Sequence, residues 1–130
     1  MGSEGAKRAG AVLIVEGEPL VRAVAADVFM DFGYRVFEAC DVADALTILE
    51  GRDDIAAVFT DIEMPGTMNG LDLAAAIRQR WSAIAVLVTS GRVYPGAGML
   101  PVSADFIPKP YLPSGAIDKM KALLVADRHE

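Results

Sequence analysis

Short apolar runs alternate along the chain with longer stretches whose apolar residues recur at helical spacing. Runs of four to six residues that are rich in Val, Ile, Leu and Phe predict buried β-strands. The run at 34–39 alternates apolar and polar residues, which favours a strand nearer an edge of the sheet. The five predicted strands cover residues 11–15, 34–39, 55–60, 85–89 and 104–107.

Helical periodicity fills most of the connections between these runs. Pro19 suits a first helical turn, and Gly33 is suited to follow the end of that helix. Asp41 is placed to cap the second helix, as Ser114 is for the last one. The predicted helices cover residues 19–32, 42–51, 71–81 and the stretch that follows Ser114.

The segment Arg92–Ser103 interrupts this alternation. It holds Pro95, Gly96, Gly98 and Pro101, and a proline costs a helix interior about 3 kcal/mol. We expect a loop or one ragged turn where regular alternation would place a helix. The pattern therefore predicts an α/β fold, a doubly wound five-strand parallel sheet whose fourth helix is short or replaced by a loop.

The bulk composition changes this picture little. With 130 residues, 53% of them hydrophobic, the chain fits one domain, which we place at 11–128 after a disordered leader at 1–10. The formal charge of −6 argues against nucleic acid as a direct partner. The single cysteine cannot form an internal disulfide, and no apolar run reaches the length of a membrane span. We expect a cytoplasmic protein.

Polar side chains follow the predicted strands, and the carboxyl ends of parallel strands meet at one edge of a sheet. That edge receives Glu16, Glu18, Asp61, Ser90 and Lys109. Crowded carboxylates repel one another unless a cation joins them, and Mg²⁺ accepts one or two carboxylates together with a phosphate. Lysine supplies a point charge for a phosphate. Asp61 would then be the nucleophile that forms an acyl phosphate.

Five short motifs follow one another along the chain. They are VLIVEGEP at 12–19, DIEMPG at 61–66, MNGL at 68–71, TSG at 89–91 and FIPKPY at 106–111. Each motif is weak alone, but all of them in this order are highly specific. Together they resemble the receiver domain of bacterial two-component response regulators, and the resemblance covers nearly the whole chain, from about Val12 to Leu124.

The resemblance implies strand order 2-1-3-4-5 and phosphorylation of Asp61 by a histidine kinase or a phosphotransfer protein. It implies bound Mg²⁺, with Glu16, Asp61 and the backbone carbonyl of Glu63 as metal ligands. The same match makes Ser90 the switch hydroxyl that turns toward the phosphoryl group. Lys109 would pair with that group. The resemblance also puts Phe106 in the place of the aromatic residue that changes rotamer on activation.

Gly17 departs from the family pattern. The family usually carries two adjacent acids after the first strand, and the second acid is the direct metal ligand. A glycine side chain cannot coordinate a metal, so we expect weaker Mg²⁺ binding than with aspartate there. Glu18 is one residue further on, and its direction is open at this stage.

The leading interpretation is a stand-alone receiver in a phosphorelay, not an enzyme acting on a free metabolite, that signals to a downstream protein target. We expect its phosphorylation-linked change to concentrate in Arg92–Ser103. The alternative is a pseudo-receiver, a protein-interaction module that works without phosphate because Gly17 replaces an acid. A third interpretation, a nucleotide- or flavin-binding protein of flavodoxin-like shape, is opposed by Glu16 and Glu18, which would repel a phosphate at the first loop.

Overall fold

The computed structural model describes residues 10–128 apart from 97, 102 and 103. The expected leader at 1–10 lies, except for Gly10, outside the described residues. The domain limits 11–128 therefore stay a prediction. In the described part of the chain, no helix combines the length and the apolar character needed to cross a membrane.

Strands and helices alternate along the described residues with one interruption. Each predicted strand is present, and its bounds differ from the prediction by one residue at most. The elements are β1 (Ala11–Val15), α2 (Pro19–Asp31), β2 (Arg35–Ala39), α3 (Val42–Gly51), β3 (Ile55–Asp61), α4 (Gly70–Arg80), β4 (Ala85–Ser90), β5 (Ala104–Pro108) and α5 (Pro113–Arg128).

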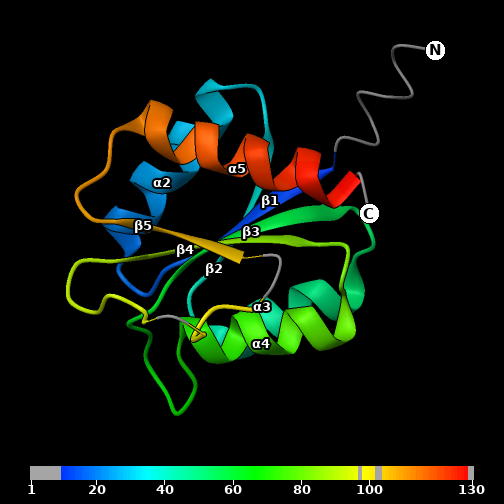
Figure 1. Cartoon of the computed structure of the whole chain (residues 1–130), viewed down its shortest axis with the longest axis vertical. Helices are drawn as coiled ribbons and strands as arrows, with labels where there is room; N and C mark the ends of the chain where they lie inside the picture. Colours follow the sequence, from blue (N-terminus) through cyan, green and yellow to red (C-terminus); the bar gives the residue numbers. More distant parts are fainter. Residues whose placement is uncertain (1–9, 97, 102–103, 129–130) are drawn as a thin grey trace.

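The strands form one parallel sheet in the order β2-β1-β3-β4-β5. Helices α2 and α5 cover one face of this sheet, and α3 and α4 cover the other (Figure 1). Strand β1 is buried along its whole length, so its apolar side chains serve both layers. These findings confirm the predicted fold class and strand order.

Two hydrophobic cores follow from this layering. Successive side chains of a strand point to opposite faces, so each central strand contributes to both cores. The core beneath α3 and α4 includes Leu13, Val15, Val58, Leu73 and Ile77. The core beneath α2 and α5 includes Ile14, Phe29, Phe59, Ile117 and Met120.

Of the two helix caps predicted from the sequence, that of α3 is confirmed and that of α5 is wrong. The Asp41 carboxylate accepts a hydrogen bond of 2.8 Å from the backbone N–H of Asp44, as expected of a cap. Helix α4 begins one residue earlier than predicted, with Asn69 and Asp72 forming a capping box. Ser114 was expected as a cap, which is wrong, because it lies inside α5.

The segment between β4 and β5 forms no helix in its described residues, which agrees with its proline and glycine content. It is held to the sheet by an aromatic contact. The ring of Tyr94 meets the ring of Phe106 edge to face, with 5.4 Å between the ring centroids. This geometry is favourable for aromatic pairs.

Gly70 sets the distance between the start of α4 and the end of β3. Its backbone N–H donates a hydrogen bond of 2.9 Å to the carbonyl oxygen of Ile62. A Cβ atom at this position would collide with the backbone carbonyl of Asp61. The glycine therefore allows α4 to approach the strand end that carries Asp61.

We predict that Gly70→Ala lowers the free energy of unfolding by more than about 2 kcal/mol, because rigid backbone cannot yield as a flexible side chain would. Gly51→Ala is the matched control, since no atom lies within 4 Å of a Cβ placed there. The control should change stability by less than about 1 kcal/mol. Urea denaturation of both variants measures the difference, and equal effects would contradict the argument.

Candidate functional site

Four strand ends bring the predicted site residues to the carboxyl edge of the sheet. Glu16 follows β1, Asp61 is the last residue of β3, Ser90 is the last of β4, and Lys109 follows β5. Glu63 lies two residues beyond Asp61, in the loop to α4. The structure thus brings together five of the residues selected from the sequence.

A single ammonium group contacts two buried carboxylates at this edge. The Nζ atom of Lys109 lies 3.1 Å from Oδ2 of Asp61 and 3.4 Å from Oε1 of Glu16. Glu16 and Asp61 are each only 6% exposed. The second oxygen of Glu16 accepts a bond of 3.0 Å from the backbone N–H of Glu18. The cluster of Lys109, Asp61 and Glu16 therefore carries a net negative charge when both acids are ionised.

Burial and the neighbouring charges shift the pKa values of this cluster. Burial raises the pKa of Asp61, the Lys109 ammonium opposes that rise, and the Glu16 carboxylate adds to it, so the pKa of Asp61 is raised. Burial lowers the pKa of Lys109, but its bonds to Asp61 and Glu16 outweigh that effect and leave its pKa raised. Lys109 therefore stays charged at neutral pH.

Ser90 is fully buried and makes three hydrogen bonds. Its hydroxyl donates to Oε2 of Glu63 at 2.6 Å. The same Oγ accepts from the backbone N–H groups of Arg92 at 3.1 Å and Val93 at 2.8 Å. The hydroxyl therefore links the loop after β3 to the loop after β4.

A cavity of about 500 Å³ opens beside Asp61. It has room for a phosphoryl group and its waters, and most of its polar side chains are acidic. Its lining includes the cation Arg92. Sequence patterns did not select Arg92, because this residue lies in the irregular segment after β4, where no periodic pattern predicts the path of the backbone. The lining residues are Glu16, Gly17, Glu18, Asp61, Glu63, Pro65 and Arg92.

Gly17 is covered by the ring of Pro65. A Cβ atom at Gly17 would lie 3.0 Å from Cδ of Pro65 and 3.7 Å from the carbonyl oxygen of Cys40. The backbone of Gly17 does not have a positive φ, so it could carry an L side chain. A larger residue at position 17 would therefore crowd against the ring of Pro65.

The side chains beside Asp61 supply oxygen ligands of the kind that Mg²⁺ takes in proteins. Among the described residues, no three or more His, Cys, Asp or Glu side chains are grouped so that they could hold a metal. The two buried carboxylates, those of Glu16 and Asp61, are among the groups that line the cavity. Mg²⁺ keeps several waters and needs only one or two carboxylates when a phosphate is present. The residues therefore suit such an ion without enclosing it.

Phe106 lies outside this cluster. It is half-buried on β5, opposite Val88 of β4 in the parallel register, and its ring contacts Tyr94. The residue pairing places it two positions before the end of the strand that leads to Lys109. Phe106 is not among the residues that line the cavity.

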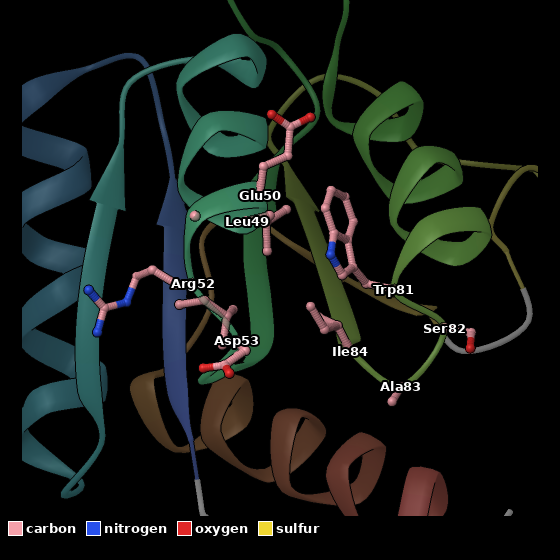
Figure 2. A pocket seen from close by; sticks show the side chains of 10 residues that line it. Leu49, Glu50, Arg52, Asp53, Trp81, Ser82, Ala83 and Ile84 are labelled. Atoms are coloured by element: carbon pink, nitrogen blue, oxygen red, sulfur yellow. The ribbon is translucent and has the colours of Figure 1, made fainter.

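A larger cavity, of about 680 Å³, lies at the opposite edge of the sheet (Figure 2). Figure 2 shows Leu49 and Glu50 on the last part of α3, facing Trp81 and Ile84 from the segment between α4 and β4. Because these residues precede the strands whose far ends carry Asp61 and Ser90, this cavity is remote from the cluster. None of the site residues lines it.

The family model for the response regulator receiver domain matches residues 12–120. The chain belongs to the response regulator receiver family. This confirms the resemblance read from its motifs. Receivers are signalling modules of two-component systems that interact with histidine kinases or phosphotransfer proteins and generally bind Mg²⁺ at the phosphorylation site.

The curated relatives that match this chain are longer proteins. The aerobic respiration control protein ArcA of Escherichia coli K12 is 36% identical over 116 residues, which cover 87% of this chain and 48% of ArcA. A putative NtrX-like response regulator of Rickettsia bellii is 31% identical over 104 residues, covering 77% of this chain and 22% of that protein. The chain thus spans about half of ArcA and less of the NtrX-like protein.

Solved structures agree with the fold. The receiver domain of the hybrid histidine kinase CckA has a TM-score of 0.72 and 33% identity, and the match covers 88% of this chain and 99% of that one. A response regulator receiver protein of Sinorhizobium medicae has a TM-score of 0.83 at 21% identity, covering 91% and 96% of the two chains. At that identity the second match supports the fold alone.

The charge cluster predicts a specific pH dependence. Because the folded receiver binds the Asp61 proton more tightly than the unfolded chain does, the Asp61 contribution to stability falls as pH rises from 3.8 through the raised pKa. Lys109→Met should raise the pKa of Asp61 further, and Glu16→Gln should lower it. Carboxyl ¹³C titration by NMR measures both changes.

Asp61→Asn is the control for the stability part of this prediction. Without the titrating group, the fall in unfolding free energy over that pH window should be smaller than in the wild-type receiver. Urea denaturation across the window supplies the comparison. Identical pH profiles of the two proteins would refute the assigned shift.

Proposed function

We propose that this receiver accepts a phosphoryl group on Asp61 from a histidine kinase or a phosphotransfer protein, and that it signals by protein interaction. The observation that carries the proposal is a buried Asp61 carboxylate, open to a cavity and 3.1 Å from the Lys109 ammonium. An oxygen of Asp61 bonds to phosphorus as the P–N bond of the donor histidine breaks. The electron pair of that bond stays with the imidazole nitrogen.

Lys109 and Ser90 are the residues of this chain that would bind the transferred group. The Lys109 ammonium already contacts Asp61 and suits a phosphoryl oxygen as a point charge. A hydroxyl can donate to another phosphoryl oxygen, which is the role proposed for Ser90. Both groups compensate negative charge that develops where two carboxylates already lie close together.

Glu16, Asp61 and the backbone carbonyl of Glu63 would hold Mg²⁺. When bound, the ion supplies positive charge that reduces the repulsion between the Asp61 carboxylate and the incoming phosphoryl group. Gly17 has no side chain that could bind the ion. Glu18 lines the same cavity but is not one of the expected metal ligands. We therefore propose that the receiver uses Mg²⁺ but binds it more weakly than an aspartate at position 17 would allow.

The response to phosphorylation would travel from Ser90 into the following segment. Arg92 and Val93 donate their backbone N–H groups to the Ser90 oxygen, and Tyr94 next to them contacts Phe106. A rotation of the Ser90 hydroxyl toward Asp61 alters both hydrogen bonds and thereby the seating of Tyr94. Phe106 is then the aromatic residue that repacks, and the exposed segment presents the change to a downstream protein.

The alternative function is a pseudo-receiver that binds its partner without phosphate. One observation favours it: Pro65 covers Gly17, so the position of the missing acid is partly filled. The intact cluster of Asp61, Lys109 and Ser90 favours the phosphate-dependent function. Phosphorylation and metal binding separate the two.

We predict that phosphoramidate, a small phosphoryl donor, adds one phosphoryl group to the wild-type protein in the presence of Mg²⁺. The Asp61→Asn protein should accept no phosphoryl group, because an amide oxygen is a poor nucleophile. The Lys109→Ala protein should be phosphorylated at least about tenfold more slowly. Intact-protein mass spectrometry over time measures all three. An unmodified wild-type protein, or equal modification of Asp61→Asn, would overturn the proposed acceptor.

We predict that Gly17→Asp tightens Mg²⁺ binding by roughly tenfold, because it adds a carboxylate beside a site that lacks one. Gly17→Ala introduces the same crowding against Pro65 without a ligand and should change the Mg²⁺ affinity less than about twofold. Calorimetric titration of both variants makes the comparison. Equal affinities of the two variants would show that position 17 does not face the metal.

A further inference from the structure

The Ser90 hydroxyl is already in use in this structure. A hydroxyl group has one proton to donate, and Ser90 donates it to the Glu63 carboxylate at 2.6 Å. A bond this short to an ionised acceptor is among the stronger kinds of hydrogen bond in proteins. While it persists, Ser90 cannot donate to a phosphoryl group on Asp61.

The other side of Ser90 is engaged as well. Its oxygen accepts from the backbone of Arg92 and of Val93, and no part of the residue is exposed to water. Three hydrogen bonds therefore fix one rotamer. Turning the hydroxyl toward Asp61 requires that the bond to Glu63 breaks and that the segment after β4 adjusts.

Glu63 also acts on the site through its charge. Its carboxylate lines the cavity beside Asp61, together with Glu16 and Glu18. A phosphoryl group in that cavity brings further negative charge and is repelled by each of these acids. Glu63 differs from Glu18 because only Glu63 also binds the Ser90 hydroxyl.

We propose that the Glu63 side chain is a latch, which competes with the phosphoryl group on Asp61 for the Ser90 hydroxyl. This inference rests on the proposed function of Asp61 and concerns the side chain of Glu63, whereas the proposed metal ligand is its backbone carbonyl. Glu63 is a positioning residue that acts through Ser90. It lowers the affinity of the site for a phosphoryl group and holds the Arg92–Val93 backbone in its unphosphorylated arrangement.

A double-mutant cycle between Glu63 and Ser90 tests the latch. The probe is beryllofluoride with Mg²⁺, and its dissociation constant is measured from backbone amide shifts by NMR. Glu63→Ala should bind it roughly tenfold more tightly than wild type, because the competing acceptor is gone. In the Ser90→Ala background only the repulsion by the Glu63 charge is left to remove, so the same change should tighten binding by less than about twofold. The difference corresponds to a coupling of about 1 kcal/mol.

Two further variants separate the hydrogen bond from the charge. Glu63→Gln removes the charge but keeps an acceptor for Ser90, so its affinity should lie between those of wild type and Glu63→Ala. Glu18→Gln removes a charge from the same cavity without touching Ser90 and should have a smaller effect than Glu63→Ala. In ligand-free Glu63→Ala, the amide signals of Arg92 and Val93 should move part of the way toward their beryllofluoride-bound positions.

The outcomes distinguish the latch from the proposed function. If wild type and Glu63→Ala bind the probe with equal affinity, the latch is refuted and the phosphoacceptor stands. The same holds if Glu63→Ala tightens binding by the same factor in the wild-type and the Ser90→Ala backgrounds. If only Glu63→Ala binds, the latch is supported. If no variant binds, including Gly17→Asp, the proposed function fails and the latch fails with it.

Discussion

The site depends on two buried carboxylates that share one ammonium group. Asp61 and Glu16 repel each other at the sheet edge, and Lys109 compensates only one of their charges. Such an arrangement is poor for stability, because a buried charge that is not fully paired costs free energy. It is well suited to bind a cation and a phosphoryl group, which together complete the charge balance. The sheet fixes these groups because each belongs to, or directly follows, one of its parallel strands.

The same edge connects the charge cluster to a surface. Ser90 bonds to Glu63 on one side and to the backbone of Arg92 and Val93 on the other. Because no helix follows in the described part of that segment, few regular hydrogen bonds oppose its movement. Under the proposed function, a change at the buried Ser90 hydroxyl would reach the exposed Tyr94 through the backbone of Arg92 and Val93.

Sequence patterns predicted the fold well, because buried parallel strands and amphipathic helices leave strong periodic signals. They also brought Asp61, Ser90 and Lys109 to one edge, since strand ends follow from strand limits. They did not predict the Glu63 side chain as the partner of Ser90, or Pro65 over Gly17, because both depend on how two loops approach in space. Ser114 was misassigned as a cap because the helix already begins at Pro113, and proline suits a first helical turn.

The most direct test is a titration of the wild-type receiver with beryllofluoride, with and without Mg²⁺, followed by backbone amide NMR. If Asp61 is a phosphoacceptor, the signals of Asp61, Ser90 and Lys109 shift together, only when Mg²⁺ is present. The absence of any shift at high Mg²⁺ would contradict this account. It would leave the buried acids and their lysine as a structural feature of a module that works without phosphate.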